Sequence, residues 1–331
     1  APNFSDFRKF FRAKLEKLFV VPADTFDNVK GDFPIGFFIW NTAKNEVFEK
    51  TIVDIYDAKG NFIGTKGIAT TDKSKYISDW LEINSKNNST NYVGHIASVG
   101  NDFQNQRMIF VDNEEKINWK KGGRHTRITA ENLIIASIFF AVRKVIPATW
   151  LNDRDQFLFP NDNWKLDTEF QNNCLSYTIF NTNVQSGFGV NHWIPFTENE
   201  VNAKEKFESN FMSDFIKGKI KSEQQADGLF GNTTTNHFDI NKPRQFSTEA
   251  TEVFNAGREL WKYYNSFNAT KANASLYDIR DFFQGRNAQG RMNAKSTDEK
   301  YTELIGNLRQ KLNLLSYKIA PKVYEYEFLK Y

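Results

Sequence analysis

The sequence predicts a mixed fold, α/β to α+β, in which buried strands come first and a mainly helical region follows. Two short apolar runs, Leu18–Val21 and Ile35–Trp40, flank a polar turn, a pattern typical of strands buried on both faces. The segment Glu131–Ile146 is apolar on nearly all sides, which predicts a buried core helix. Toward the C-terminus, apolar residues recur at steps of three and four, which indicates amphipathic helices.

Residues 1–68 are expected to form one section that holds a helix and four strands. Apolar side chains from Phe4 to Leu18 recur at steps of three and four with cations between them, which predicts an amphipathic helix. Turn residues then separate the apolar runs that follow. The expected elements are a helix over Phe10–Leu18, strands over Phe19–Pro22 and Phe33–Trp40, and a hairpin of Val47–Tyr56 with Asn61–Gly67.

Residues 69–331 are expected to form a second region, largely helical towards its C-terminus. Asp167 or Thr168 can cap a helix, and Thr197-Glu-Asn-Glu200 has the form of a capping box, because both supply acceptors for free N–H groups. The polar stretch from Gly218 to Ser247 predicts a long loop. The other expected elements are a helix over Lys75–Ile83, strands over Tyr92–Val99 and Met108–Val111, helices over Asp167–Phe180 and from Val201 to near Gly218, and three final helices over Phe254–Tyr264, Leu276–Phe283 and Tyr301–Ile319.

Composition narrows the class of protein. A chain of 331 residues can bury a sizeable core, and its net charge of +3 permits nucleic-acid binding without indicating it strongly. The single cysteine excludes an internal disulfide and fits a reducing cytoplasm. No run of eighteen apolar residues and no signal peptide is present, so no membrane association is expected.

The opening segment LEKLFVVPADTFDNVKGDFPIGFFIWNT and later phrases resemble one group of proteins. The phrases WLNDRDQFLFP, GVNHWIPFT, AGRELWKYY and NASLYDIRDFFQGRN are similar to the C-terminal part of bacterial adenine-specific DNA methyltransferases of restriction–modification systems. The resemblance covers nearly all of the chain. It implies the closing strands of a Rossmann-like methyltransferase sheet in residues 1–68, followed by a target-recognition region in residues 69–331.

Two motifs that such enzymes need are absent from this sequence. No two of the eight prolines are adjacent, so the Asp/Asn-Pro-Pro-aromatic tetrapeptide that holds the adenine amine is missing. The G-x-G at Gly187-Phe-Gly189 is not followed by a helix pattern, so it does not predict a cofactor turn. We therefore expect the chain to hold no cofactor and no catalytic residue of its own. S-adenosylmethionine would be bound by an N-terminal half of the enzyme, a partner expected alongside double-stranded DNA.

The resemblance assigns a role to an aromatic residue in the turn after the first strand. In such enzymes this residue stacks on the adenine once the base has left the duplex, which replaces part of the lost stacking. Phe26 occupies this position, and Phe33 is the alternative if the register differs. The competing interpretation is that Phe26 is an ordinary core residue.

Two segments combine cations with glycines, which suits contact with a phosphate backbone. The first, Trp119–Arg127, can also be a solvated basic loop. The second, Gly285–Lys295, adds side chains that pair with bases in a major groove, or it ties helices together. The predicted DNA contacts are Lys30, Lys120, Lys121, Arg124, Arg127, Arg286, Asn287, Arg291 and Lys295.

Two other functions remain open from the sequence. The chain can be a stand-alone DNA-binding specificity module that serves a separate catalytic subunit. It can also be a metal-dependent nuclease or hydrolase, in which Asp153, Asp155 and Asp162 hold Mg²⁺ near Lys165. Asp residues in loops mostly cap turns and helices, however. Four scattered histidines give no zinc-ligand spacing.

Overall fold

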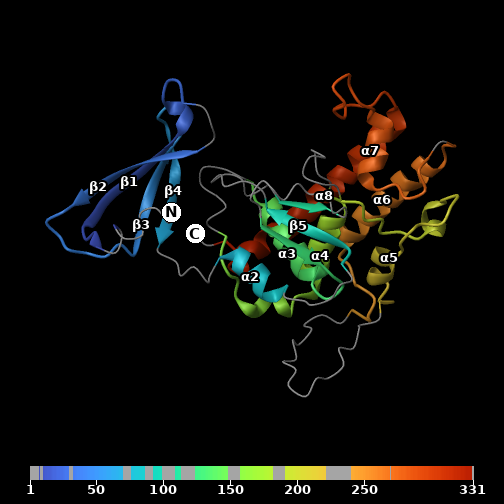
Figure 1. Ribbon diagram of the computed structural model, residues 1–331, viewed down its shortest axis with the longest axis horizontal. Coiled ribbons are helices and arrows are strands. Elements are labelled where there is room, and N and C mark those ends of the chain that lie inside the picture. Colours follow the sequence, from blue (N-terminus) through green and yellow to red (C-terminus); the bar gives the residue numbers. More distant parts are fainter. Residues whose placement is uncertain are drawn as a thin grey trace, which may run out of the picture.

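A computed structural model describes residues 7, 10–29, 33–69, 76–85, 92–98, 109–112, 124–147, 157–181, 191–220, 240–268 and 270–329. It has a mixed sheet near the N-terminus and a mainly helical C-terminal region, so the predicted mixed α/β class is confirmed (Figure 1). A Rossmann-like arrangement is not confirmed. The described residues form two separate hydrophobic clusters, one in the first sheet and one in the helical body.

The first sheet has four strands in the order β2-β1-β3-β4. β1 pairs with β2 in antiparallel fashion and with β3 in parallel, and β3 and β4 form an antiparallel hairpin. The predicted strands and hairpin are thus confirmed. The bounds are β1 Lys14–Pro22, β2 Pro34–Asn41, β3 Lys50–Tyr56 and β4 Phe62–Ala69.

The helix predicted over Phe10–Leu18 is wrong for most of its length, because β1 begins at Lys14. A β-bulge between Leu15 and Lys17 explains the misleading spacing. The extra residue turns Leu15 toward the same core as Leu18, so two strand residues three apart share a face as they would on a helix. Among the described residues ahead of the strand, Phe7 and Phe10 are helical, and the Phe11 N–H donates to the Phe7 carbonyl at 2.9 Å.

The prediction that these strands are buried on both faces is also wrong. Four residues of β1 and β3 are buried against one another: Leu18, Val20, Val53 and Ile55. Along β2, Phe37, Phe38 and Ile39 are 38%, 55% and 55% exposed. β2 is also an edge strand of this sheet. Apolar content alone therefore did not distinguish a doubly covered strand from an uncovered one.

A second, smaller sheet and three helices follow. Its strands lie in the order β6-β5-β7. Asn132 joins this sheet to the helices, because its side chain accepts from the Thr129 N–H at 2.8 Å and donates to the Arg127 carbonyl at 2.9 Å. The predicted helices and the first two strands are confirmed. Residues 124–127 of the basic segment Trp119–Arg127, for which a loop was the alternative interpretation, lie in strand β7. The bounds are α2 Ile77–Asn84, β5 Gly94–Ser98, β6 Ile109–Asp112, β7 Arg124–Ile128, α3 Leu133–Val145 and α4 Thr168–Ile179.

Helix α4 lies at the centre of the body although half of its residues are polar. Asp167 caps it, as predicted, by accepting from the Phe170 N–H at 2.8 Å. Its buried amides bind connecting segments, since Gln171 donates to the Trp164 carbonyl at 3.0 Å and Asn172 donates to the Gln245 carbonyl at 2.8 Å. These bonds satisfy backbone groups of loops that would otherwise lack partners inside the protein.

The last part of the chain contains the three predicted amphipathic helices, and α8 packs along α6 (Figure 1). Lys318 of α8 lies between Glu169 of α4 and Glu249 of α6, at 3.0 and 2.9 Å. The helix expected after Thr197 is much shorter: a 3-10 turn over Glu198–Val201 precedes a six-residue helix. The bounds are α5 Phe211–Ile216, α6 Thr248–Asn265, α7 Leu276–Gln284 and α8 Glu299–Glu325.

Candidate nucleic-acid interface

The turn after β1 holds Phe26 in a fixed and partly exposed position. β1 ends at Pro22, and the 3-10 turn Ala23–Thr25 follows it. The Phe26 N–H donates to the Ala23 carbonyl at 3.2 Å, and the Ala23 N–H donates to the Phe33 carbonyl at 2.9 Å. Phe26 and Phe33 are each 39% exposed and belong to neither hydrophobic cluster. Phe26 therefore offers part of its ring to solvent, from a backbone that is already ordered.

Phe26 is one end of an aromatic row that crosses the sheet. Its ring centroid lies 6.1 Å from that of Phe37, which stacks on Phe19 at 4.8 Å. Phe19 contacts Tyr56 at 6.1 Å, and Tyr56 contacts Phe62 at 5.7 Å. The strand register produces the row, because Phe19 lies opposite Phe37 and Tyr56 lies opposite Phe62. The row therefore contacts Phe26 through Phe37, while Phe26 stays partly exposed.

The predicted basic segment before Asn132 is only partly within the described residues. Lys30, Lys120 and Lys121 lie outside them, and of Arg124 only the backbone, in β7, is described. Arg127 is exposed, and its guanidinium lies 5.2 Å from the centroid of the Tyr92 ring. Burial and the Arg127 charge lower the pKa of the neighbouring His125 imidazole. The structure therefore describes the side chain of one of these five predicted contacts, Arg127.

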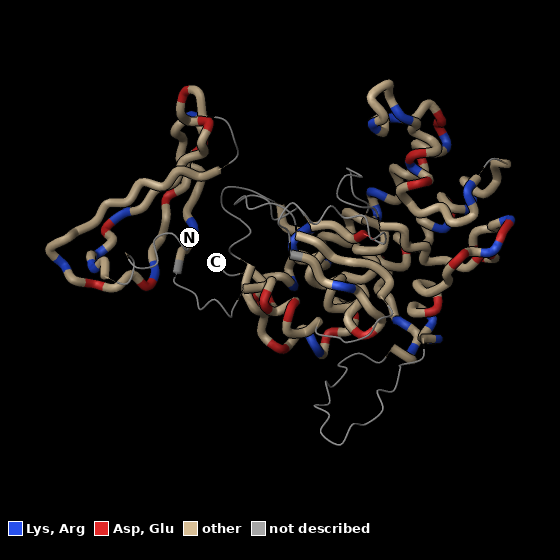
Figure 2. Tube along the Cα trace, in the orientation of Figure 1, with Lys and Arg blue, Asp and Glu red and all other residues tan. Residues whose placement is uncertain are grey.

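The second basic segment forms a loop between α7 and α8, which we call the α7–α8 loop, residues 285–297. It projects from the helical body and contains Lys and Arg residues (Figure 2). Residues 284–297 include three cations and no acid. Arg286 and Met292 form an isolated antiparallel bridge, which makes residues 286–292 a short ribbon with a turn at its tip.

The four predicted contacts in this loop are placed differently. Arg286 and Asn287 make hydrogen bonds within the loop: Arg286 Nη1 donates to the Gly290 carbonyl at 2.9 Å, and Asn287 Oδ1 accepts from the Arg291 N–H at 2.9 Å. Arg291 and Lys295 are exposed, and their side chains make no hydrogen bond or ion pair with the residues that the structure describes. Gln289, which was not predicted as a contact, is exposed in the same way.

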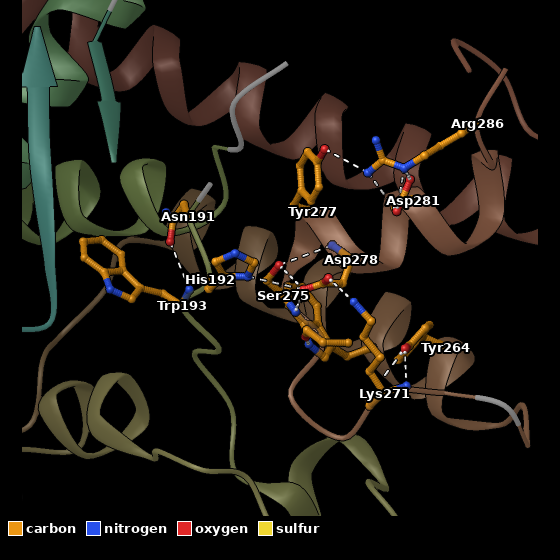
Figure 3. Close-up of polar contacts among 12 residues, drawn as sticks. Asn191, His192, Trp193, Tyr264, Lys271, Ser275, Tyr277, Asp278, Asp281 and Arg286 are labelled. Atoms are coloured by element: carbon orange, nitrogen blue, oxygen red, sulfur yellow. Dashed lines mark hydrogen bonds and ion pairs between the residues drawn. The ribbon is translucent and has the colours of Figure 1, made fainter. Parts of the chain in front are cut away.

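A polar cluster fixes the start of α7, below the loop (Figure 3). The Asp278 carboxylate accepts from the Ser275 N–H at 3.0 Å, and Ser275 Oγ accepts from the Asp278 N–H at 3.3 Å, which together form a capping box. The Ser275 hydroxyl also donates to the carboxylate at 2.7 Å. Lys271 Nζ and His192 Nδ1 lie 3.1 and 3.4 Å from the same carboxylate. Burial raises the pKa of Asp278, but the hydrogen bonds from His192, Ser275 and Lys271 outweigh it and hold the pKa far below its ordinary value. The Ser-x-x-Asp spacing is that of a capping box, but neither this cap nor the contact with His192 was predicted from the sequence.

The residues proposed for a metal site do not come together in the part of the chain that is described. Asp153 and Asp155 lie outside it. Asp162 pairs with Lys165 at 2.7 Å, and its side chain is 79% exposed. Among the described residues, no group of three or more His, Cys, Asp or Glu side chains could hold a metal ion. Nor does any helix in the described ranges combine the length and apolar character needed to cross a bilayer.

Comparison with protein-family models, with curated proteins and with solved structures finds no match to this chain.

Proposed function

We propose that the chain is the C-terminal portion of an adenine-specific DNA methyltransferase of a restriction–modification system, and that it contributes base stacking and DNA recognition. The complete enzyme would transfer a methyl group from S-adenosylmethionine to the exocyclic amine of adenine, with the cofactor bound by its N-terminal half. The observation that carries the proposal is the position of Phe26, which is 39% exposed at the end of a supported aromatic row.

An aromatic side chain can offset part of the free energy lost when a base leaves its stack. Extrusion of one nucleotide costs a few kcal/mol, and stacking on an aromatic side chain returns roughly 1–3 kcal/mol. The hydrogen bonds of Ala23 hold the Phe26 backbone in place before any ligand binds. Little conformational entropy is then lost when the ring meets a base, so most of the stacking energy is available for binding.

The exposed edge of the first sheet is consistent with a larger catalytic sheet. β2 is unpaired on its outer side within the described sheet, and it carries exposed Phe37, Phe38 and Ile39. Long apolar edge strands of this kind are prone to pair with further strands. In the proposed enzyme β1–β4 are the closing strands of a Rossmann-like sheet, and the N-terminal half provides the neighbouring strands and the covering helices.

Phe26→Ala tests the stacking role directly. The chain is mixed with a duplex that carries 2-aminopurine opposite an abasic site, and with the same duplex fully paired. We expect tighter binding to the first duplex together with quenched 2-aminopurine fluorescence. The substitution should abolish the quenching and weaken binding to that duplex about 5- to 150-fold, while Phe26→Trp restores both.

Phe62→Ala is the matched control, because Phe62 lies at the opposite end of the row and is 57% exposed. It should leave the quenching unchanged. Equal quenching in the wild type and in Phe26→Ala would refute the assignment of Phe26. Micromolar binding of S-adenosylmethionine to the chain, measured by calorimetry, would contradict the expectation that the cofactor site lies elsewhere.

The α7–α8 loop favours a second candidate function, a specificity module that binds DNA for a separate catalytic subunit. Exposed Arg291 and Lys295, in a segment without acids, suit a polyanion whichever of the two functions is correct. The two candidate functions differ in whether Phe26 stacks on an unpaired base. A module that only grips duplex DNA gains nothing from an unpaired base, so it would bind the paired duplex and the abasic-site duplex equally well.

A further inference from the structure

We propose that the ribbon of residues 286–292 enters the major groove of DNA, where Arg291 and Gln289 contact base edges, and that Arg286 and Asn287 are positioning residues. This inference rests on the proposed DNA recognition and deepens it by identifying the side chains that read the sequence. Four properties of the loop support it: the clamp at Arg286, the turn at Asn287, the anchoring of the ribbon, and the exposed tip.

The guanidinium of Arg286 is committed to contacts with α7 and with the loop, and Figure 3 shows those with Asp281 and Tyr277 of α7. Nε lies 2.9 Å from Asp281 Oδ1, and Nη2 donates to Asp281 Oδ2 at 3.0 Å. Nη1 donates to the Gly290 carbonyl at 2.9 Å, and Nη2 also contacts the Tyr277 hydroxyl at 3.3 Å. Every guanidinium nitrogen thus has a partner. To pair with guanine, Arg286 would first lose its ion pair with Asp281, to whose Oδ2 both Nε and Nη2 donate, so its geometry favours a clamp between α7 and the tip.

Asn287 shapes the turn at the tip. Its side-chain oxygen accepts from the Gln289 N–H at 3.0 Å and from the Arg291 N–H at 2.9 Å. Its own N–H donates to the Arg291 carbonyl at 2.9 Å, which closes the ribbon. Gly290 has a φ of +72°, a left-handed conformation that glycine adopts without a steric penalty. These bonds use the amide oxygen that Asn287 would need to pair with adenine.

The base of the ribbon is anchored to α7 on both sides. The Asn293 side chain donates to the Gln284 carbonyl at 2.9 Å, and the Gln284 side chain donates to the Asn293 carbonyl. The Asn293 N–H donates to the Gly285 carbonyl at 2.9 Å. Ser296 donates to the Phe283 carbonyl at 2.6 Å. The tip is therefore ordered by its own hydrogen bonds, which lowers the entropic cost of placing its side chains in a groove.

What the ribbon presents to solvent matches the chemistry of the major groove. Arg291 and Gln289 are exposed, and neither side chain bonds to any residue in the described part of the chain. Arg pairs with the two acceptors of guanine, and Gln pairs with the donor and acceptor of adenine. A two-stranded ribbon fits a groove about 12 Å wide. Lys295, also exposed and free of acidic neighbours within the loop, can contact a phosphate at the groove edge.

The test begins with selection of a preferred duplex by the wild-type chain from a pool of randomised duplexes. Binding to the selected duplex and to a scrambled one is then measured by fluorescence anisotropy over a range of salt concentrations. Arg291→Ala and Gln289→Ala should each weaken binding to the selected duplex about 5- to 150-fold, with a smaller effect on the scrambled one. Arg291→Lys should retain the salt dependence and lose the sequence preference, because an ammonium cannot pair with guanine in a bidentate manner.

Two further variants separate positioning from charge. Asp281→Asn removes a negative charge, so electrostatics alone would raise DNA affinity. Because it also releases the Arg286 clamp, we expect it to lower the preference for the selected duplex. Lys59→Ala is the matched control, since it removes an exposed cation in the turn between β3 and β4. It should change neither affinity nor preference.

The outcomes distinguish this inference from the function on which it rests. If Arg291→Ala and Gln289→Ala keep the wild-type preference, the ribbon does not read bases, although DNA recognition stands. If the wild type binds every duplex equally, the ribbon does not read bases and only non-specific DNA binding stands. If the wild type binds no duplex at low salt, both the inference and the proposed function are wrong, and the exposed cations serve an acidic partner of another class.

Discussion

Close packing in the helical body predicts different effects for one substitution made at two glycines. Gly257 lies in the middle of α6 and Gly306 in α8. A Cβ on Gly257 would lie 2.4 Å from Phe180 Cε1 and 3.0 Å from Phe180 Cζ, whereas a Cβ on Gly306 would meet nothing within 4 Å. Gly306 is exposed, so its alanine variant measures helix propensity without new contacts.

The Phe180 ring has little room to retreat from a new methyl group. It is 2% exposed, and its centroid lies 5.1 Å from that of Phe254 and 6.3 Å from that of Trp261. Gly→Ala inside a helix stabilises by about 1 kcal/mol, and overpacking a core costs roughly 1–3 kcal/mol. Gly306→Ala should therefore gain about 1 kcal/mol, and Gly257→Ala should range from neutral to a loss of about 2 kcal/mol.

Urea unfolding followed by tryptophan fluorescence measures both variants, and Trp261 lies within the cluster that is tested. The predicted result is a midpoint raised for Gly306→Ala and unchanged or lowered for Gly257→Ala, with similar slopes. The difference between the two free energies of unfolding isolates the overpacking cost, because the propensity gain is common to both. If the two variants are stabilised equally, the α6–Phe180 contact is not as close as described.

Three other substitutions test particular contacts. The pKa of Asp278 in the folded protein lies below its ordinary 3.8, so the ionised side chain stabilises the fold at neutral pH and loses this effect as the pH falls below about 5. The stability advantage of the wild type over Asp278→Asn should therefore shrink on acidification. Melting temperature measured against pH tests this. Burial and the hydrogen bond to Asp167 raise the pKa of Tyr326 from 10.0 to about 12. Between these pH values the unfolded chain releases the phenol proton before the folded chain does. The wild type should therefore lose stability relative to Tyr326→Phe over this range. Asn132→Ala leaves the buried Thr129 N–H without its acceptor and should cost about 1–3 kcal/mol in urea unfolding, whereas the exposed Asn307→Ala should cost far less.

Sequence patterns succeeded where a single physical cause sets the structure. The apolar run of α3 and the Asp167 cap each follow from local chemistry, and the structure contains both. The segment Lys14–Leu18 failed because its helical spacing comes from a β-bulge, and a bulge is fixed by pairing with β2. Such pairing involves residues distant in sequence, so local periodicity cannot indicate it.

In the candidate site, too, local chemistry was predictable from the sequence and contacts between distant residues were not. Its aromatic and basic residue types were visible in the sequence, but their roles depend on contacts. Arg286 and Arg291 have the same chemistry, yet Asp281 pairs with the first, whereas the side chain of the second bonds to no residue in the described part of the chain. Gln289 was overlooked because a lone amide in a loop gives no sequence signal, and it stands out only once the Asn287 turn presents it.

DNA affinity as a function of salt concentration tests the central claim, DNA recognition, most directly. For the wild-type chain and a 30-base-pair duplex, the logarithm of the affinity should fall linearly with the logarithm of salt, by about 0.9 for each phosphate contacted. Lys295→Ala should reduce that slope by about 1, and Lys59→Ala should leave it unchanged. No binding at low salt, or binding that does not vary with salt, would contradict the proposal.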